Sequence, residues 1–130
     1  MRDVKHILVI DDDEAVRRAF ELALEDSGYE VTLVDGGQKG VDEVQKNIYD
    51  LVFLDLKMPG MDGVATLKKI RAFSMTLPVY IVTGFHREFL AGLDEVRQAG
   101  LPFQLLRKPV GSVEILALAH SALDKPAQFY

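Results

Sequence analysis

The sequence contains no cysteine, so it can form neither a disulfide framework nor a metal site built from thiolates. It also has no long apolar run. No segment approaches the roughly 18 residues of a membrane-spanning helix, and the short apolar stretch near the N-terminus meets acidic residues too early for a signal peptide. The net charge of −5 leaves no excess of basic residues for nucleic acid. These absences predict a soluble, cytoplasmic domain that binds neither nucleic acid nor a membrane.

The 130 residues suit a single domain over 1–130, and nearly half of them are apolar. Short apolar runs alternate with segments in which apolar residues recur at helical spacing. The predicted strands are 5–11, 29–34, 50–55, 78–83 and 103–107. Their runs are continuous, which favours strands buried on both faces, and the second is the weakest. Strict alternation predicts a doubly wound α/β fold with helices on both faces of a parallel sheet.

Capping and stop residues delimit the predicted helices. We expect helices from the cap Asp13 to Gly28, over 37–47, from Asp62, over 86–99 with Gly100 as the stop, and from the cap Ser112. Gly92 falls inside the fourth helix and should weaken it by roughly 1 kcal/mol relative to alanine. The tail from Asp124 to Tyr130 is expected to fray, so the folded core should cover about 5–124.

Polar side chains follow four of the predicted strands. Asp11 and Asp12 follow the first, Asp55 ends the third, Thr83 ends the fourth, and Lys108 follows the fifth. In an open parallel sheet these strand ends lie along one edge, where α/β folds bind ligands. Carboxylates, a hydroxyl and an ammonium gathered there predict a site for a divalent cation and a phosphoryl group.

Each of these residues also has a plainer interpretation when it is taken alone. An acid after a strand can cap a helix or sit in a turn, Thr83 can simply end its strand, and Lys108 can be a surface lysine. Adjacent carboxylates nevertheless repel one another, and Mg²⁺ prefers oxygen ligands. A carboxylate such as Asp55 can also act as a nucleophile toward phosphorus. The order of the whole set along the chain is what favours a functional site.

The motifs that carry these residues resemble the receiver domain of two-component response regulators. They read Ile-Leu-Val-Ile-Asp-Asp-Asp-Glu, then Asp-Leu-Val-Phe-Leu-Asp-Leu-Lys-Met-Pro-Gly-Met-Asp-Gly, then Ile-Val-Thr-Gly and finally Lys-Pro. The resemblance covers nearly the whole chain and every motif is in order. It implies a flavodoxin-like, five-stranded parallel sheet in the order 2-1-3-4-5 with five helices.

The resemblance implies that Asp55 accepts a phosphoryl group from the phosphohistidine of a histidine kinase and later loses it to water. Asp11 and Asp12 match the acidic pair that holds Mg²⁺, and Asp55 and the backbone carbonyl of Lys57 match the remaining protein ligands. Such a domain catalyses only its own phosphorylation and dephosphorylation, so it is a signalling phosphoacceptor rather than an enzyme with a separate substrate.

The phosphoryl group itself has three expected partners. Thr83 matches the switch hydroxyl, Gly84 matches the small residue whose N–H reaches a phosphoryl oxygen, and Lys108 matches the lysine that pairs with the phosphoryl group. The bond between Lys108 and Pro109 is commonly cis in the family, against about 5–6% for X–Pro bonds in general.

Partners follow from the same resemblance. A sensor histidine kinase or a phosphotransfer protein would supply the phosphoryl group, and an effector protein or a fused output domain would read it. Phosphorylation-dependent homodimers are a further expectation.

One switch position departs from the family pattern. Leu105 stands where receivers often carry tyrosine or phenylalanine, and Phe103 is the nearest aromatic residue on that strand. The segment before Lys108 can accommodate an extra residue, with Arg107 in a bulge or a shifted loop. Phe85 is then the bulky side chain expected either to repack on phosphorylation or to serve as a fixed loop anchor.

Three alternatives belong to other classes. A degenerate receiver would bind proteins without taking phosphate, but the site residues are all intact, which argues against it: Asp11, Asp12, Asp55, Thr83 and Lys108. A phosphatase of the haloacid dehalogenase type is suggested by Asp11 and Asp13, but Ala15 replaces its usual threonine or valine and the chain is short. A nucleotide-binding flavodoxin-like protein would need a glycine-rich loop after the first strand, which is missing.

Overall fold

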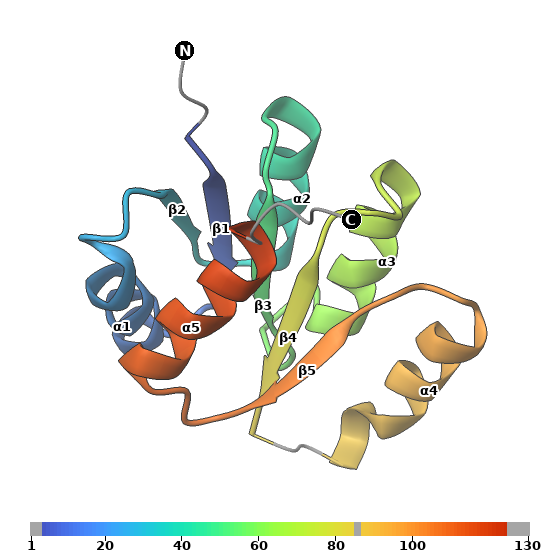
Figure 1. The fold of residues 1–130 in the computed structure, drawn as a ribbon. Coiled ribbons are helices and arrows are strands. Elements are labelled where there is room, and N and C mark those ends of the chain that lie inside the picture. Colours follow the sequence, from blue (N-terminus) through green and yellow to red (C-terminus); the bar gives the residue numbers. More distant parts are fainter. Residues whose placement is uncertain (1–3, 85–86, 125–130) are drawn as a thin grey trace, which may run out of the picture.

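A computed structural model describes residues 4–84 and 87–124, and it contains one parallel five-stranded sheet in the order β2-β1-β3-β4-β5 (Figure 1). This order confirms the predicted doubly wound, flavodoxin-like fold. The strands are β1 (His6–Ile10), β2 (Glu30–Val34), β3 (Leu51–Asp55), β4 (Val79–Thr83) and β5 (Gln104–Arg107). The helices are α1 (Glu14–Leu24), α2 (Gly37–Lys46), α3 (Gly63–Phe73), α4 (Leu90–Gln98) and α5 (Ser112–Leu123), and a 3₁₀ turn, η1 (Arg87–Phe89), precedes α4.

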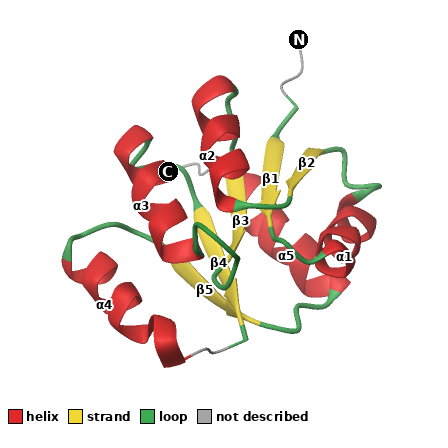
Figure 2. Cartoon of the chain, turned by 180° about the vertical axis from the view of Figure 1, so that it is seen from behind, coloured by secondary structure: helices red, strands yellow, loops and turns green. Residues whose placement is uncertain are grey.

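The helices divide between the two faces of the sheet. Helices α1 and α5 cover one face, seen in front in Figure 1, and α2 and α3 cover the other, seen in front in Figure 2. Successive strand side chains point to opposite faces, so Ile7 and Val9 join the core under α1 and α5, whereas Leu8 and Ile10 join the core under α2 and α3. Strands β1 and β3 are therefore buried on both faces, as their apolar runs predicted.

Strand β5 differs from its prediction. It lies at the edge of the sheet and is largely exposed, with Leu105 40% exposed, so the expectation that all five strands are buried on both faces was wrong. An apolar run does not by itself distinguish a central strand from an edge strand. The expected bulge at Arg107 was also wrong, because pairing with β4 is continuous from Tyr80 and Gln104 to Thr83 and Arg107.

Of the two predicted helix caps, Asp13 is confirmed and Ser112 is wrong, and Asp62, where the third helix was expected to open, also proves to be a cap. The side chain of Asp13 accepts a hydrogen bond from the N–H of Ala15, and the side chain of Asp62 accepts one from Ala65. Ser112, expected as the cap of α5, is instead its first helical residue. The helix begins one residue earlier because the carbonyl of Gly111 already accepts a hydrogen bond from the N–H of residue 115.

The fourth helix is shorter than expected. The segment predicted as one helix over 86–99 is divided into η1 and α4, and its first residue, His86, lies outside the described residues. Gly100, with φ of 77°, follows it as predicted. Gly92 is the third residue of α4, and a Cβ there would lie 3.3 Å from both γ-methyl groups of Val64. The absence of a side chain at Gly92 therefore allows α4 to pack closely against Val64 of α3.

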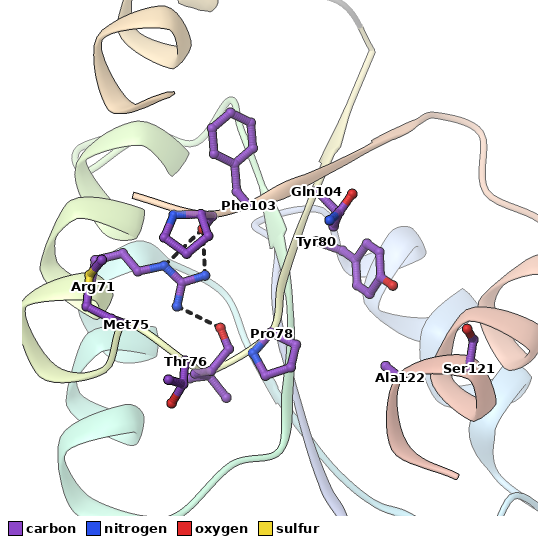
Figure 3. A pocket seen from close by; sticks show the side chains of 11 residues that line it. Arg71, Met75, Thr76, Pro78, Tyr80, Phe103, Gln104, Ser121 and Ala122 are labelled. Atoms are coloured by element: carbon purple, nitrogen blue, oxygen red, sulfur yellow. Dashed lines mark hydrogen bonds between the residues drawn. The ribbon is translucent and has the colours of Figure 1, made fainter. Parts of the chain in front are cut away.

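A cavity of about 260 Å³ opens beside the first residues of β4 and β5 (Figure 3). One wall is the buried Arg71, whose guanidinium donates hydrogen bonds to the carbonyls of Ser74, Leu77 and Pro102. Burial lowers the pKa of this guanidinium. These bonds tie together the loops that precede β4 and β5, at the end of the sheet opposite the predicted site residues.

The C-terminal end of α5 is held by side chains. The carboxylate of Asp124 accepts hydrogen bonds from Tyr29 and His120, so this residue is not frayed as expected. The remaining residues of the predicted tail, 125–130, lie outside the described part of the chain. Within the described part, no helix is both long and apolar enough to cross a membrane.

Candidate functional site

Three carboxylates meet where β1 and β3 end. Asp11 follows β1 and Asp55 is the last residue of β3, and because these strands are parallel neighbours their carboxyl ends lie at one edge. Asp11, Asp12 and Asp55 each offer a carboxylate oxygen, and these atoms lie within 4.8 Å of one another. Asp11 and Asp55 are only 2% and 6% exposed, whereas Asp12 is exposed. The structure thus brings together the three acids that the sequence predicted as metal ligands.

Burial and mutual repulsion disfavour ionisation of these acids. Burial, followed by the charge of Asp11, raises the pKa of Asp55 to about 6, although Lys108 acts in the opposite direction. The pKa of Asp11 is also raised, mainly by burial, and is partly held down by the backbone N–H of Asp13 and by Lys108. A bound cation would offset this repulsion and favour the ionised carboxylates.

Lys108 brings an ammonium group into the acid cluster. Its Nζ lies 3.0 Å from Oδ1 of Asp55 and 3.3 Å from Oδ2 of Asp11. Burial acts to lower the pKa of Lys108, but the hydrogen bond to Asp55 and the two carboxylate charges outweigh it, so the pKa is raised. The backbone N–H of Lys108 donates to the carbonyl of Thr83 at 2.8 Å, which positions the residue. The peptide bond between Lys108 and Pro109 is cis, as predicted.

Thr83 and Gly84 complete this edge of the sheet. Thr83 is the buried last residue of β4, the strand that pairs with β3, and Gly84 follows it in an exposed position. Both residues therefore lie at the same edge of the sheet as Asp55, as the sequence predicted. Phe85, predicted as a repacking side chain or loop anchor, lies outside the described residues.

Sequence reasoning missed two residues that shape the site. Arg17, on the first turns of α1, donates from Nη1 to the carbonyl of Asp11 at 2.8 Å and so fixes the loop that carries the acids. Gly63 lies against the backbone at the end of β3: a Cβ there would be 2.4 Å from the carbonyl oxygen of Asp55. Neither contact has a local sequence signal, because each joins segments that meet only in the folded chain.

Lys57 lies on the exposed rim of the site, two residues after Asp55. Its Nζ lies 3.6 Å from Oε1 of Glu88, which belongs to η1. The ion pair connects the loop after β3 with the turn that precedes α4. The family resemblance implies a role only for the backbone carbonyl of Lys57, and no sequence pattern predicts this ion pair.

A doubly wound parallel sheet with three acids, a hydroxyl and a lysine at the carboxyl ends of its strands defines a receiver-type signalling domain. Comparison with known proteins gives the same result: a family model described as the response regulator receiver domain matches residues 7–120, and the chain belongs to this family. It is a receiver domain of two-component systems, as its motifs indicated.

Individual relatives agree with this assignment. The chain is 33% identical over 118 residues to the transcriptional regulatory protein FixJ of Bradyrhizobium diazoefficiens, with 91% of this chain and 56% of that protein covered. It is 37% identical over 120 residues to the uncharacterized transcriptional regulatory protein YkoG of Bacillus subtilis, with coverage of 91% and 50%. The chain therefore spans about half the length of these curated relatives.

Solved structures show the same fold. A CheY-like response regulator receiver domain protein from Methanospirillum hungatei superposes with a TM-score of 0.82 at 28% identity, over 94% of this chain and 95% of that one. The chemotaxis protein CheY4 of Vibrio cholerae superposes with a TM-score of 0.80 at 25% identity, over 93% and 100%.

Proposed function

We propose that this domain accepts a phosphoryl group on Asp55, with Mg²⁺ held beside it, and that the phosphorylated form switches an output surface. The observation that carries the proposal is the meeting of three carboxylates with one ammonium group: the acids lie within 4.8 Å of one another, and Nζ of Lys108 lies 3.0 Å from Asp55. Phosphoryl transfer needs positioning and charge neutralisation above all, and this cluster offers both.

The residues at the site fit a magnesium ion. Asp11, Asp12 and Asp55 supply carboxylate oxygens, the donors that Mg²⁺ prefers, and the backbone carbonyl of Lys57 would be a fourth protein ligand. Burial is the main cause of the raised pKa values of Asp11 and Asp55, and the charges of neighbouring acids add to it, so a cation beside them would favour their ionised forms. When bound, the ion supplies positive charge that offsets the charge on the phosphoryl oxygens.

Asp55 would act as the nucleophile. One of its carboxylate oxygens attacks phosphorus, an O–P bond forms, and the bond from phosphorus to the nitrogen of a phosphohistidine breaks, so that the leaving imidazole keeps the electron pair. Lys108 and the N–H of Gly84 would hold phosphoryl oxygens, and the hydroxyl of Thr83 would turn toward them. Hydrolysis by water later restores the carboxylate, so the domain catalyses only its own phosphorylation and dephosphorylation.

The proposed partners are those of a receiver. A sensor histidine kinase or a phosphotransfer protein supplies the phosphoryl group, and an effector protein or a fused output domain reads the result, with a phosphorylation-dependent homodimer as a further form. The relatives FixJ and YkoG are named as transcriptional regulatory proteins. We propose residues 1–130 as one receiver domain with a folded core of about 5–124.

Incubation with acetyl phosphate tests this function. The protein should gain one acid-stable, base-labile phosphate in the presence of Mg²⁺ and none after the metal is chelated. Asp55→Asn should gain none while keeping the parent's circular dichroism spectrum. A parent protein that binds partners but never takes phosphate would instead be a degenerate receiver, a phosphorylation-independent binding module, and the proposal would be wrong.

A further inference from the structure

The side chain of Lys57 carries a positive charge at the rim of the proposed phosphorylation site, and no step of the proposed reaction uses it. The ammonium pairs with Glu88 at 3.6 Å, and both side chains are 60% exposed. Exposed ion pairs of this kind contribute little, so this one can exchange partners easily. Lysine suits such an exchange because its charge lies at the end of a flexible four-carbon stem.

Phosphorylation would add negative charge near Lys57 and so favour a change of its ion-pair partner. Among the residues that the structure describes, Lys108 is the one whose ammonium pairs with acids of this cluster, with Asp11 and Asp55. Phosphorylation adds a group of roughly −1.5 to −2 charge with strong acceptor oxygens, and it adds this group two residues from Lys57. The ammonium of Lys57 should therefore be attracted more strongly to the partly buried phosphoryl group than to the single exposed carboxylate of Glu88.

We infer that the ammonium of Lys57 pairs with Glu88 while Asp55 is unmodified. Once Asp55 is phosphorylated, this ammonium binds the phosphoryl group as a second cation beside Lys108. The inference rests on the proposed function and adds a step to it. Because Glu88 belongs to η1, which leads directly into α4, the exchange of partners also releases a link between the phosphorylation site and α4. Glu88 and the phosphoryl group thus compete for one lysine.

The same region provides a matched control. Lys68 on α3 pairs with Glu95 on α4 at 2.7 Å, and this pair is also exposed. It joins α4 to α3, whereas the first pair joins η1 to the loop after β3, and it involves none of the site residues. Glu95→Gln therefore removes an equivalent carboxylate from the α4 region without affecting Lys57.

The competition can be measured with beryllofluoride, a mimic of the phosphoryl group, in saturating Mg²⁺. Its affinity for the whole chain is followed through the amide signal of Gly84. Loss of the competing carboxylate in Glu88→Gln should tighten binding roughly 2–5-fold, the range expected from one exposed ion pair. Lys57→Met should weaken binding, and Glu95→Gln should leave it unchanged. Thermal unfolding of each variant verifies that the fold is intact.

The double variant is decisive. If Glu88 acts by holding Lys57, then Lys57→Met with Glu88→Gln should bind beryllofluoride as Lys57→Met alone does. Equal tightening by Glu88→Gln in both backgrounds would show a general charge effect and overturn the inference, as would a Glu88→Gln variant that binds like the parent. If the parent itself shows no saturable response and acetyl phosphate leaves Asp55 unmodified, the proposed function fails together with the inference.

Discussion

Nζ of Lys108 lies 3.0 Å from Oδ1 of Asp55, although the two residues come from strand ends on different strands, β5 and β3, with β4 between them. The contact is made across the edge of the sheet, and its consequence is electrostatic. Lys108 lowers the pKa of Asp55 against the opposing effects of burial and of Asp11, and the result is a pKa of about 6. This lysine therefore helps to keep the proposed nucleophile ionised near neutral pH.

Removal of the ammonium should show this effect directly. In Lys108→Ala the pKa of Asp55 should rise above its value in the parent, because the opposing charge is lost while burial remains. The pH at which phosphorylation by acetyl phosphate reaches half its maximum should move upward with it. Carboxyl ¹³C signals measured across pH would report the pKa, and an unchanged or lower value would contradict the assigned role of Lys108.

The stability of the metal-free protein should depend on pH through Asp55. A carboxyl whose pKa is higher in the folded state than in the unfolded state stabilises the fold at low pH, and this contribution is lost as pH rises through the folded pKa. With a reference value of 3.8 and a folded value of about 6, the loss should occur between these two pH values. Asp55→Asn should therefore stabilise the metal-free fold by roughly 1–3 kcal/mol at pH 8.

Urea unfolding of parent and variant at pH 4 and pH 8, with metal chelated, measures this difference. The gain in free energy of unfolding should be larger at pH 8. A gain that is equal at both pH values would show that Asp55 does not titrate in this range.

Asp12 should matter more to the metal than to the fold. Asp12→Ala removes one of the three clustered carboxylates, so Mg²⁺ binding should weaken by tenfold or more, on the order of one lost charged ligand. The metal-free protein should be slightly more stable, because repulsion with Asp11 and Asp55 falls. Isothermal titration with Mg²⁺ tests the first effect, and parent-like affinity would remove Asp12 from the metal site.

Gly63 is predicted to be intolerant of any side chain. The Cβ of alanine at this position would lie 2.4 Å from the carbonyl oxygen of Asp55 and 2.6 Å from Cα of Leu56, so the backbone beside the nucleophile must shift. Gly63→Ala should cost about 1–3 kcal/mol of stability and should slow phosphorylation. Gly36→Ala is the control, since a Cβ there has no neighbour within 4 Å; equal losses in both variants would contradict the steric argument.

The output surface carries the remaining prediction. Leu105 replaces the expected aromatic switch residue and is 40% exposed, so it has no ring to move between buried and exposed positions. We expect the response to beryllofluoride and Mg²⁺ to extend from Thr83 and Gly84 into α4. Backbone amide spectra would show shifts along 90–98 as well as beside Asp55. Shifts confined to the neighbours of Asp55 would mean that α4 does not take part in switching.

The sequence predicted most of the fold because buried parallel strands have a distinctive pattern. The apolar runs that became β1 and β3 are continuous, and the caps Asp13 and Asp62 have side chains that accept hydrogen bonds locally. Among the predictions that were wrong are the burial of β5, which depends on its position in the sheet, and the cap of α5, which differs by one residue. Exposure of β5 follows from its place at the edge, and Ser112 lies one residue too late to cap α5.

The sequence predicted which residues form the candidate site, but it did not predict the distances and contacts between them. Strand ends alone placed Asp11, Asp55 and Lys108 at one edge. Their distances, the raised pKa values and the pairing of Lys57 with Glu88 depend on how neighbouring loops are held after folding. Such contacts join residues far apart in the sequence, and no local pattern encodes them.

Chemical trapping of the phosphorylated residue is the sharpest test of Asp55 as the phosphoacceptor. After incubation with acetyl phosphate and Mg²⁺, borohydride reduces an aspartyl phosphate to homoserine, which peptide mass spectrometry locates along the chain. We expect homoserine at position 55 of the parent and at no position of Asp55→Asn. Homoserine at another acid in comparable yield, or none in a parent protein that is folded and has bound Mg²⁺, would contradict this assignment.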